Sequence, residues 1–293
     1  MKHRVIGIGD NVVDKYLHTG LMYPGGNALN FSIYAKQLGL DSAFMGVFGD
    51  DEPARHVQDT LHHLGVDTQR CRRYSGENGY ACIDLIEGER TFIQSNKGGV
   101  LREHPLVLES TDLDYITGFD LVHVSLNSYL ESQLAVIKKQ NVPLSFDFSM
   151  RGTDDYFRQV CPFIDYGFVS CGHLSEEATK NKLKMLFEYG CSTVIATRGH
   201  EGVYYYDGGE VVFYNPEYIK PIDTLGAGDS FLTGFLVSFL FSDNNQIESL
   251  SNLSDKHKRE YVLMAIEKGN QLAGQTLRHY GAFGYGKPFN SSQ

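Results

Sequence analysis

Apolar residues along this chain form short strand-like runs that alternate with stretches of helical periodicity. The first strand-like runs are residues 5–9 and 42–48, and the first helical stretches are residues 27–38 and 53–64. This order is typical of βαβ units, which build a largely parallel sheet with helices on both faces. The alternation continues with predicted strands at residues 120–124, 144–148 and 166–170 and predicted helices at residues 131–140, 154–160 and 175–189.

One region interrupts the alternation. Residues 79–86 and 90–95 are predicted strands with no helix between them, so we expect a β hairpin. Such a hairpin would suit a lid that excludes water from an active site, although an ordinary surface hairpin explains the pattern equally well. Nearer the C-terminus, residues 242–260 predict a polar loop with one short helix, and residues 261–280 predict a final amphipathic helix.

Size and composition indicate one large domain. The chain has 293 residues, of which 42% are hydrophobic, and α/β proteins often form a single core of about this size. No segment approaches the roughly 18 apolar residues of a membrane span, and the first residues lack the apolar stretch of a signal peptide. The 5 cysteines are odd in number and lack paired metal-ligand spacing. We therefore expect a soluble protein of the reducing cytoplasm.

The charge of the chain limits its partners. The formal net charge is −10, whereas nucleic acid or an anionic membrane would require a basic face. We expect neither as a partner. ATP remains compatible with this charge, because a few backbone amides are enough to bind its phosphates locally.

The stretch from Asp223 to Asp229 carries the clearest chemical signal. Its sequence is Asp-Thr-Leu-Gly-Ala-Gly-Asp, and an apolar run follows at once. The small residues 226–228 leave their N–H groups free to converge on a phosphate at the start of a helix. Asp229 lies in the first helical turn, where the helix dipole favours its charge, and is a candidate general base. An N-capping aspartate after a flexible loop is the alternative.

A second group of polar residues follows the first predicted strand. Asp10 and Asp14 lie on the side where open α/β sheets place their ligands, and Asp14 is suited to accept hydrogen bonds from sugar hydroxyls. Gly25 and Gly26 allow close approach of the backbone, and Asn27 offers both a donor and an acceptor. This combination suits a polyol, whereas a turn that merely caps the next helix explains it about as well.

Several common nucleotide sites and catalytic motifs are missing. Gly7-Ile8-Gly9-Asp10 begins like a dinucleotide fingerprint, but the third glycine is absent and an acidic residue stands where a pyrophosphate would bind. The chain contains no P-loop, no Gly-x-Ser-x-Gly nucleophile elbow and no zinc-ligand spacing. Residues 197–202 form a glycine-rich connection that is able to lie along a nucleotide, or that is a plain tight turn.

Taken together, these motifs resemble the ribokinase family of carbohydrate kinases, also called the PfkB family, over nearly the whole chain. Within that family, three short segments look most like bacterial fructoselysine 6-kinases: residues 9–14, 146–149 and 278–282. The family motifs are Gly25-Gly26-Asn27, Gly49-Asp50-Asp51, Thr197-x-Gly199-x-x-Gly202 and Asp223-Thr224-x-Gly226-Ala227-Gly228-Asp229.

The resemblance implies a three-layer α/β sandwich with a central, mostly parallel sheet and a small β lid. It places the lid at about residues 11–24 and 72–100 of a single domain, and in several family members the lid also forms a homodimer interface. It further implies Mg²⁺-ATP as the phosphate donor and, in many members, a monovalent cation such as K⁺ near the Asp223 loop.

The resemblance also assigns roles to individual positions. Asp229 would be the catalytic base, and the amides of Gly226, Ala227 and Gly228 would bind the transferred phosphate. A metal-linked Asn-x-x-Glu motif of the family is incomplete here, because the asparagine is missing, and this leaves Glu176, or its neighbour Glu177, as the candidate metal residue. The sugar would contact Asp14, Gly26, Asn27 and Asn127, and the nucleotide would contact Thr197, Gly199, Gly202, Thr224 and Asn270.

The expected reaction is transfer of the ATP γ-phosphate to a primary hydroxyl of a fructosamine of the fructoselysine type. Another sugar or nucleoside kinase of the same family is the nearest alternative, and a non-catalytic nucleotide-binding regulator is a more remote one. A glycated amino acid would also require groups for its ammonium and carboxylate, for which the lid residues Glu77, Tyr80 and Lys97 are candidates.

Overall fold

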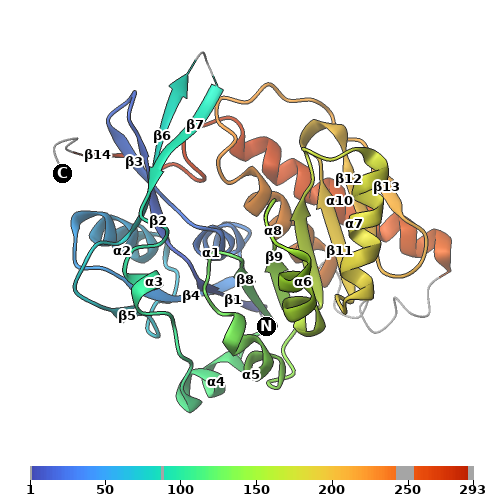
Figure 1. The fold of residues 1–293 in the computed structure, drawn as a ribbon, viewed down its shortest axis with the longest axis horizontal. Coiled ribbons are helices and arrows are strands. Elements are labelled where there is room, and N and C mark those ends of the chain that lie inside the picture. Colours follow the sequence, from blue (N-terminus) through green and yellow to red (C-terminus); the bar gives the residue numbers. More distant parts are fainter. Residues whose placement is uncertain (1, 87–88, 242–253, 290–293) are drawn as a thin grey trace.

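A computed structural model describes residues 2–86, 89–241 and 254–289 of the chain (Figure 1). The loop and short helix expected within residues 242–260 lie outside the described residues as far as residue 253. Within the described part, no helix combines the length and the hydropathy that crossing a membrane requires.

The centre of the fold is a nine-stranded sheet. Its strands are parallel from β5 to β11, while β12 and β13 form an antiparallel edge. The strand order is β13 (Val212–Tyr214), β12 (Val203–Tyr206), β11 (Thr193–Thr197), β10 (Tyr166–Ser170), β9 (Leu144–Asp147), β8 (Leu121–Ser125), β1 (Arg4–Gly9), β4 (Asp41–Phe48) and β5 (Arg72–Arg73).

Strand β1 separates two parts of this sheet: β4 and β5 lie on one side of it, and the strands from β8 to β13 lie on the other. After β1 the chain proceeds outward through β4, and it then returns to β8 on the other side of β1 and proceeds in the opposite direction. Open α/β sheets bind their ligands at such a switch point, outside the carboxyl ends of the strands. The residues that follow β1, β8 and β9 are therefore positioned for a site.

Helices cover both faces of the sheet, which gives the three layers expected from the sequence (Figure 1). Side chains along β1 alternate: Val5 packs against α8 and α10, and Ile6 and Ile8 pack in the cluster on the opposite face. One face carries α1 (Asn27–Gln37), α2 (Glu52–Leu64), α8 (Ala227–Phe241) and α10 (Asp255–Thr276); the other carries α3 (Val100–Glu103), α4 (Ser110–Ile116), α5 (Leu134–Lys138), α6 (Asp154–Val160) and α7 (Glu176–Glu188).

Helix ends follow local sequence signals. At α2, the side chain of Asp51 accepts a hydrogen bond from the N–H of Ala54 at 2.9 Å, and Pro53 occupies the first turn. The same helix ends at Gly65, which has a left-handed φ of 68°. The boundaries of this helix could therefore be predicted to within one residue.

The predicted hairpin is confirmed, and it belongs to a second sheet that Figure 1 shows projecting from the main body. Residues 72–73, which the expected lid range included, instead pair with β4 in the large sheet. The second sheet has the order β14 (Lys287–Pro288), β3 (Leu21–Gly25), β2 (Val12–Tyr16), β6 (Gly79–Ile86) and β7 (Glu89–Ser95).

Two predicted helices differ from those in the structure. The single helix expected at residues 131–140 is a 3₁₀ turn at Glu131–Gln133 followed by the short α5. The last helix starts earlier than predicted, because Ser254 accepts a hydrogen bond from the N–H of His257 and caps a polar, solvent-exposed first turn. Because the residues of that turn are polar, apolar periodicity does not reveal that it is helical.

Candidate active site

Asp229 lies in the first turn of α8, and its carboxylate is held by two carboxamides from α1. Its Oδ1 accepts a hydrogen bond from Asn27 Nδ2 at 2.9 Å, and its Oδ2 accepts one from Asn30 Nδ2 at 2.6 Å. Asn27 and Asn30 are one helical turn apart and therefore share a face of α1. The carboxylate thus bonds to side chains of another helix, which the capping alternative does not explain.

Asn27 makes further contacts that connect three strands of the sheet. Its Nδ2 also donates to Asp147 Oδ2 at 3.0 Å, at the end of β9. Its backbone N–H donates to Asp10 Oδ2 at 2.7 Å, just after β1. Its Oδ1 accepts from Asn127 Nδ2 at 2.9 Å, just after β8. The ends of three strands at the switch point and the start of α8 therefore all contact one residue, Asn27.

Asp10 caps α1 from a distance. The residue before the helix is Gly26, which has no side chain to offer, and Asp10 Oδ1 lies 3.3 Å from the N–H of Ala28. Asp10 is only 3% exposed, and its carboxylate also accepts hydrogen bonds from the hydroxyls of Ser125 and Ser128. Because Asp10 caps the helix, the side chain of Asn27 remains available to bind the other two carboxylates.

Burial changes the acidity of this group. Burial, with a further contribution from Asp10, raises the pKa of Asp229 to about 6, although the hydrogen bonds from Asn30 and Asn27 oppose the change. Burial and the charge of Asp229 raise the pKa of Asp147 to about 7. A carboxylate with a pKa near 6 is a stronger base than an ordinary aspartate and is still ionised at neutral pH.

The glycine-rich turn is supported by packing against the C-terminal segment. Gly226 has a φ of 72°, and a Cβ at this position would lie 2.5 Å from Ala282 Cβ and 2.8 Å from Tyr34 Oη. Tyr34 Oη donates to the carbonyl of Ala282, which fixes this contact from the side of α1. Gly228 is different, because a Cβ there would meet no atom within 4 Å outside its own stretch of helix in the described parts of the chain. Only one of the two glycines is therefore required by the packing.

Asp223, at the start of the same turn, connects it to the second sheet. Its Oδ2 accepts hydrogen bonds from the hydroxyl of Tyr16 in β2 and from the N–H of Gly281 at 3.0 Å. Its Oδ1 accepts from the N–H of Leu225 at 3.0 Å. The position of the turn therefore depends on both sheets.

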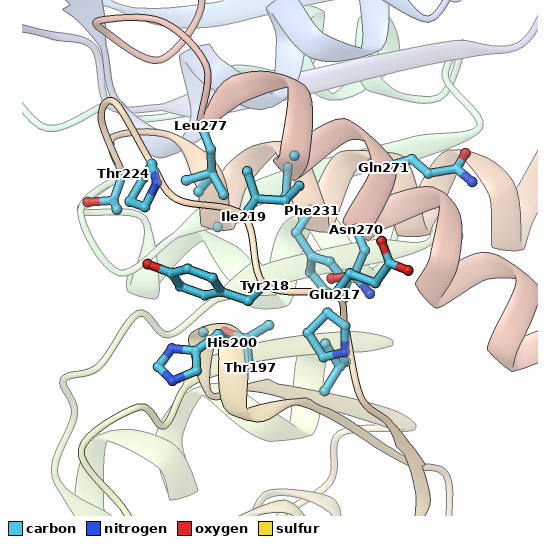
Figure 2. Close-up of a pocket in the computed structure, with 18 of the residues that line it drawn as sticks. Thr197, His200, Glu217, Tyr218, Ile219, Thr224, Phe231, Asn270, Gln271 and Leu277 are labelled. Carbon is cyan, nitrogen blue, oxygen red and sulfur yellow. The ribbon is translucent and has the colours of Figure 1, made fainter.

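A cavity of about 620 Å³ opens beside the turn (Figure 2). Apolar side chains from several elements form much of its wall, including Val203, Ile219, Phe231 and Leu277. Figure 2 shows the ring of Tyr218 near that of His200, and their centroids are 5.7 Å apart. Six residues expected at the nucleotide or the phosphate line this cavity: Thr197, Gly199, Thr224, Ala227, Gly228 and Asn270.

Three other expected residues lie apart from this cavity. Gly226 and Gly202 are not among its lining residues, and a Cβ on Gly202 would lie 2.3 Å from the ring of Phe213. Glu176 lies in the exposed first turn of α7, where its carboxylate forms an ion pair with Lys180 at 2.6 Å. Among the residues that the structure describes, no three His, Cys, Asp or Glu side chains are grouped to hold a metal ion.

The remaining expected sugar contacts lie on the second sheet and at the start of α1. Asp14 is buried in β2, and Gly25 lies so close that a Cβ there would be 2.4 Å from Asp14 Oδ2. Gly26 has a φ of 117°, and its Cβ position is 2.8 Å from the carbonyl oxygen of Asp10. Both glycines are needed for close packing around the two aspartates.

Sequence reasoning gave no role to several residues of this site. Asn30 could have been found from its spacing of three residues from Asn27 on a predicted helix. Asp147 belongs to residues 146–149, which were noted only because they resemble fructoselysine 6-kinases. Arg151 follows Asp147 by four residues, and its Nη2 donates a hydrogen bond to Asn127 Oδ1 at 2.7 Å. Tyr34 gave no signal, since a tyrosine within an apolar helix predicts core packing.

A parallel α/β sheet with a polar site at its switch point and an adjoining cavity defines a class of ligand-binding α/β enzymes. The chain belongs to the pfkB family of carbohydrate kinases, whose model matches residues 4–282. It is 39% identical to the fructosamine kinase FrlD of Bacillus subtilis, over 98% of this chain and 95% of that protein.

Two further proteins support the same assignment. The chain is 30% identical to the fructoselysine 6-kinase of Shigella flexneri, over 94% of this chain and 98% of that one. Its fold is similar to the fructokinase with bound ATP from Xylella fastidiosa, with a TM-score of 0.78, 16% identity, and coverage of 97% of this chain and 94% of the other. The protein is therefore a carbohydrate kinase with a ribokinase-like fold, as the sequence motifs predicted.

The two glycines of the turn provide a matched pair for mutation. We expect Gly226→Ala to lower the free energy of unfolding by about 1–3 kcal/mol from backbone strain alone, with further loss from the clash with Ala282. Gly228→Ala should change it by less than about 1 kcal/mol, because the position is helical and open. Urea denaturation of both variants measures the difference, and equal stabilities would contradict the described packing.

Proposed function

We propose that this protein is an ATP-dependent kinase that phosphorylates a primary hydroxyl of a fructosamine of the fructoselysine type. The observation that carries the proposal is the environment of Asp229, a buried carboxylate of raised pKa held by Asn27 and Asn30 beside a cavity of nucleotide size. The choice of a fructosamine rests on similarity to the fructosamine and fructoselysine kinases.

In the proposed reaction, Asp229 accepts the proton of the attacking hydroxyl. The N–H groups of Gly226, Ala227 and Gly228 stabilise the charge on the transferred phosphoryl group, at the positive end of the α8 dipole. Such a base contributes about 10²–10⁴-fold to the rate, and the rest comes from positioning and electrostatic stabilisation.

In this proposal, groups from both sheets bind and position the sugar. Asn27 and Asn127 already exchange a hydrogen bond, and their remaining hydrogen-bonding capacity suits adjacent hydroxyls. Asp14 approaches from β2 in the second sheet. We infer that this sheet closes over the sugar and excludes water, which would otherwise compete as phosphate acceptor.

The cavity suits the nucleoside part of ATP. Its apolar walls provide packing for a base, with Thr197, Gly199 and Thr224 along the expected path of the nucleotide. Among the residues that the structure describes, Asn270 Nδ2 is buried there without a hydrogen-bond partner. A buried, unpaired donor is costly, and an acceptor nitrogen of adenine would remove that cost.

The metal assignments follow the family. Mg²⁺ would accompany ATP and neutralise phosphate charge. Glu176, which pairs with Lys180 outside the cavity, would order its hydration shell rather than ligate it directly, since this ion keeps much of its water. A monovalent cation near the Asp223 loop would use oxygens other than the Asp223 carboxylate, which accepts three hydrogen bonds from Tyr16, Gly281 and Leu225.

We propose a homodimer through the second sheet, whose outer strand β7 is exposed at Phe92 and Ile93. We also propose a cytoplasmic location, where the free thiols of the 5 cysteines would stay reduced.

A substrate panel tests the proposed function. With Mg²⁺-ATP, we expect the highest kcat/KM for a glycated amino acid, and lower values for fructose, ribose and nucleosides. Preference for a sugar or nucleoside would favour the other family activities, and ATP binding without turnover of any panel member would favour a regulator. Release of ADP in a coupled assay is the measurement.

The raised pKa of Asp229 predicts a pH profile. The base must be ionised to accept a proton, so kcat/KM should fall about tenfold per pH unit below about pH 6. Asp229→Asn should lose about 10²–10⁴-fold in kcat while it still binds ATP. A profile that stays flat to pH 4.5, or near-normal turnover by this variant, would rule out the assignment.

Asn270 and its neighbour on α10 allow a test of the nucleotide site. Asn270→Ala should raise the KM for ATP about three- to tenfold, the value of one hydrogen bond, with little change in kcat. Gln271→Ala is the matched control, because that side chain lines the same cavity but is exposed and pairs with Glu267 and Lys268. An equal effect of both substitutions would argue against adenine recognition by Asn270.

A further inference from the structure

The active site contains more negative charge than phosphate transfer to a neutral sugar requires. Asp10, Asp147 and Asp229 converge on Asn27, and within the described residues none of the three forms an ion pair. Asp229 has a role as the base and Asp10 caps α1, whereas Asp147 has no role in the reaction described above. A substrate that carries its own positive charge would compensate this carboxylate.

Asp147 is close enough to Asp229 for both to contact one small ligand. Both carboxylates accept from the same atom, Asn27 Nδ2, at 3.0 and 2.9 Å, so their oxygens are separated by at most about two hydrogen-bond lengths. A ketose spans a similar distance between its C6 hydroxyl and a substituent at C1. The nearby Asn30 Oδ1 is buried and has no hydrogen-bond partner in the described part of the chain, so this part of the site is also incomplete without a ligand.

A positive group lies at the other side of the same asparagine pair. Arg151 Nη2 donates to Asn127 Oδ1 at 2.7 Å, and Asn127 in turn donates to Asn27. Arg151 is exposed, and its guanidinium has further donors for a carboxylate. The asparagines expected to bind the sugar therefore have Asp147 on one side and Arg151 on the other.

One short segment supplies both charges. Residues 147–151 begin at the last residue of β9. The N–H of Ser149 donates to Asp147 Oδ1 at 2.7 Å, and Ser149 has a φ of 54°. This turn fixes the Asp147 carboxylate and directs the chain back toward Asn127. An anion and a cation on one turn match the charges of an amino acid attached to a sugar through its amine.

We propose that residues 147–151 recognise the amino-acid part of the substrate: Asp147 accepts a hydrogen bond from the secondary ammonium at C1 of the ketose, and Arg151 binds the carboxylate. This role rests on the proposed function. It differs from the lid residues Glu77, Tyr80 and Lys97 considered from the sequence, because the recognition groups belong to the large sheet.

Three substrates separate the two contacts. Nα- and Nε-fructosyllysine carry both the ammonium and the carboxylate, and the better of the two is used. N-fructosylcadaverine is the decarboxylated analogue of both and keeps the ammonium. Fructose has neither group and is measured as a substrate or, where turnover is too slow, as a competitive inhibitor.

The variants should affect these substrates selectively at pH 8. Asp147→Asn should lower kcat/KM for both fructosyl amines about tenfold more than it lowers the value for fructose, which reports the loss of one acceptor for Asn27 or Ser149 alone. Arg151→Gln should lower kcat/KM about tenfold for fructosyllysine only, and Arg151→Lys should restore part of it. Asp154→Asn and Arg158→Gln, which alter an exposed ion pair on α6, are the matched controls and should change none of the values.

Each contradictory result has a distinct meaning. A loss of similar size on fructose and on the fructosyl amines would show that Asp147 only positions Asn27 and would overturn its proposed role. A loss of similar size on fructosyllysine and fructosylcadaverine would overturn the role of Arg151. If the wild-type enzyme phosphorylates another sugar but neither glycated lysine, the proposed function itself fails, and this is seen before any variant is made.

Discussion

The active site depends on one side chain, the carboxamide of Asn27, which joins elements that are distant in sequence. Its nitrogen bonds to Asp229 on α8 and to Asp147 at the end of β9, its oxygen bonds to Asn127 after β8, and its backbone N–H bonds to Asp10 after β1. Because these groups come from three strands and two helices, the site exists only when the whole fold is assembled. Asn27 itself is placed at the first position of α1 by Gly26, whose left-handed backbone only a glycine adopts without strain.

Burial of these carboxylates lowers the stability of the fold and raises the basicity of Asp229. Buried carboxylates without ion pairs are unfavourable, and the raised pKa values of Asp229 and Asp147 reflect that cost. For both groups the native state binds the proton more tightly than the unfolded chain does. They therefore lower the stability of the fold as the pH rises through the range between the ordinary aspartate pKa and about 6 to 7. The same unfavourable burial makes Asp229 a stronger base. It also means that a cationic group bound to Asp147 would stabilise that buried carboxylate.

Local signals allowed much of the fold to be predicted, while the contacts between distant segments were hidden from the sequence. Asp51, Pro53 and Gly65 define α2 through chemistry within a few residues, and the turn from Asp223 to Asp229 has a composition that few other roles require. The early start of α10 was missed because its first turn is polar, and the pairing of residues 72–73 with β4 has no local cause. Asp147 and Arg151 have no distinguishing sequence pattern, because their contacts with Asn27 and Asn127 form only when the sheet brings distant segments together. Hydrophobic periodicity does not predict such contacts.

The central claim is that Asn27, Asn30 and burial together hold Asp229 as a base with a pKa near neutrality. Carboxyl-carbon NMR of protein with ¹³C-labelled aspartate, titrated from pH 3 to pH 9, measures this pKa directly, and the Asp229→Asn variant assigns the signal. The account predicts an aspartate signal that titrates near pH 6 and is missing from the variant. A signal assigned in this way that titrates near pH 4, as in an exposed aspartate, would contradict it.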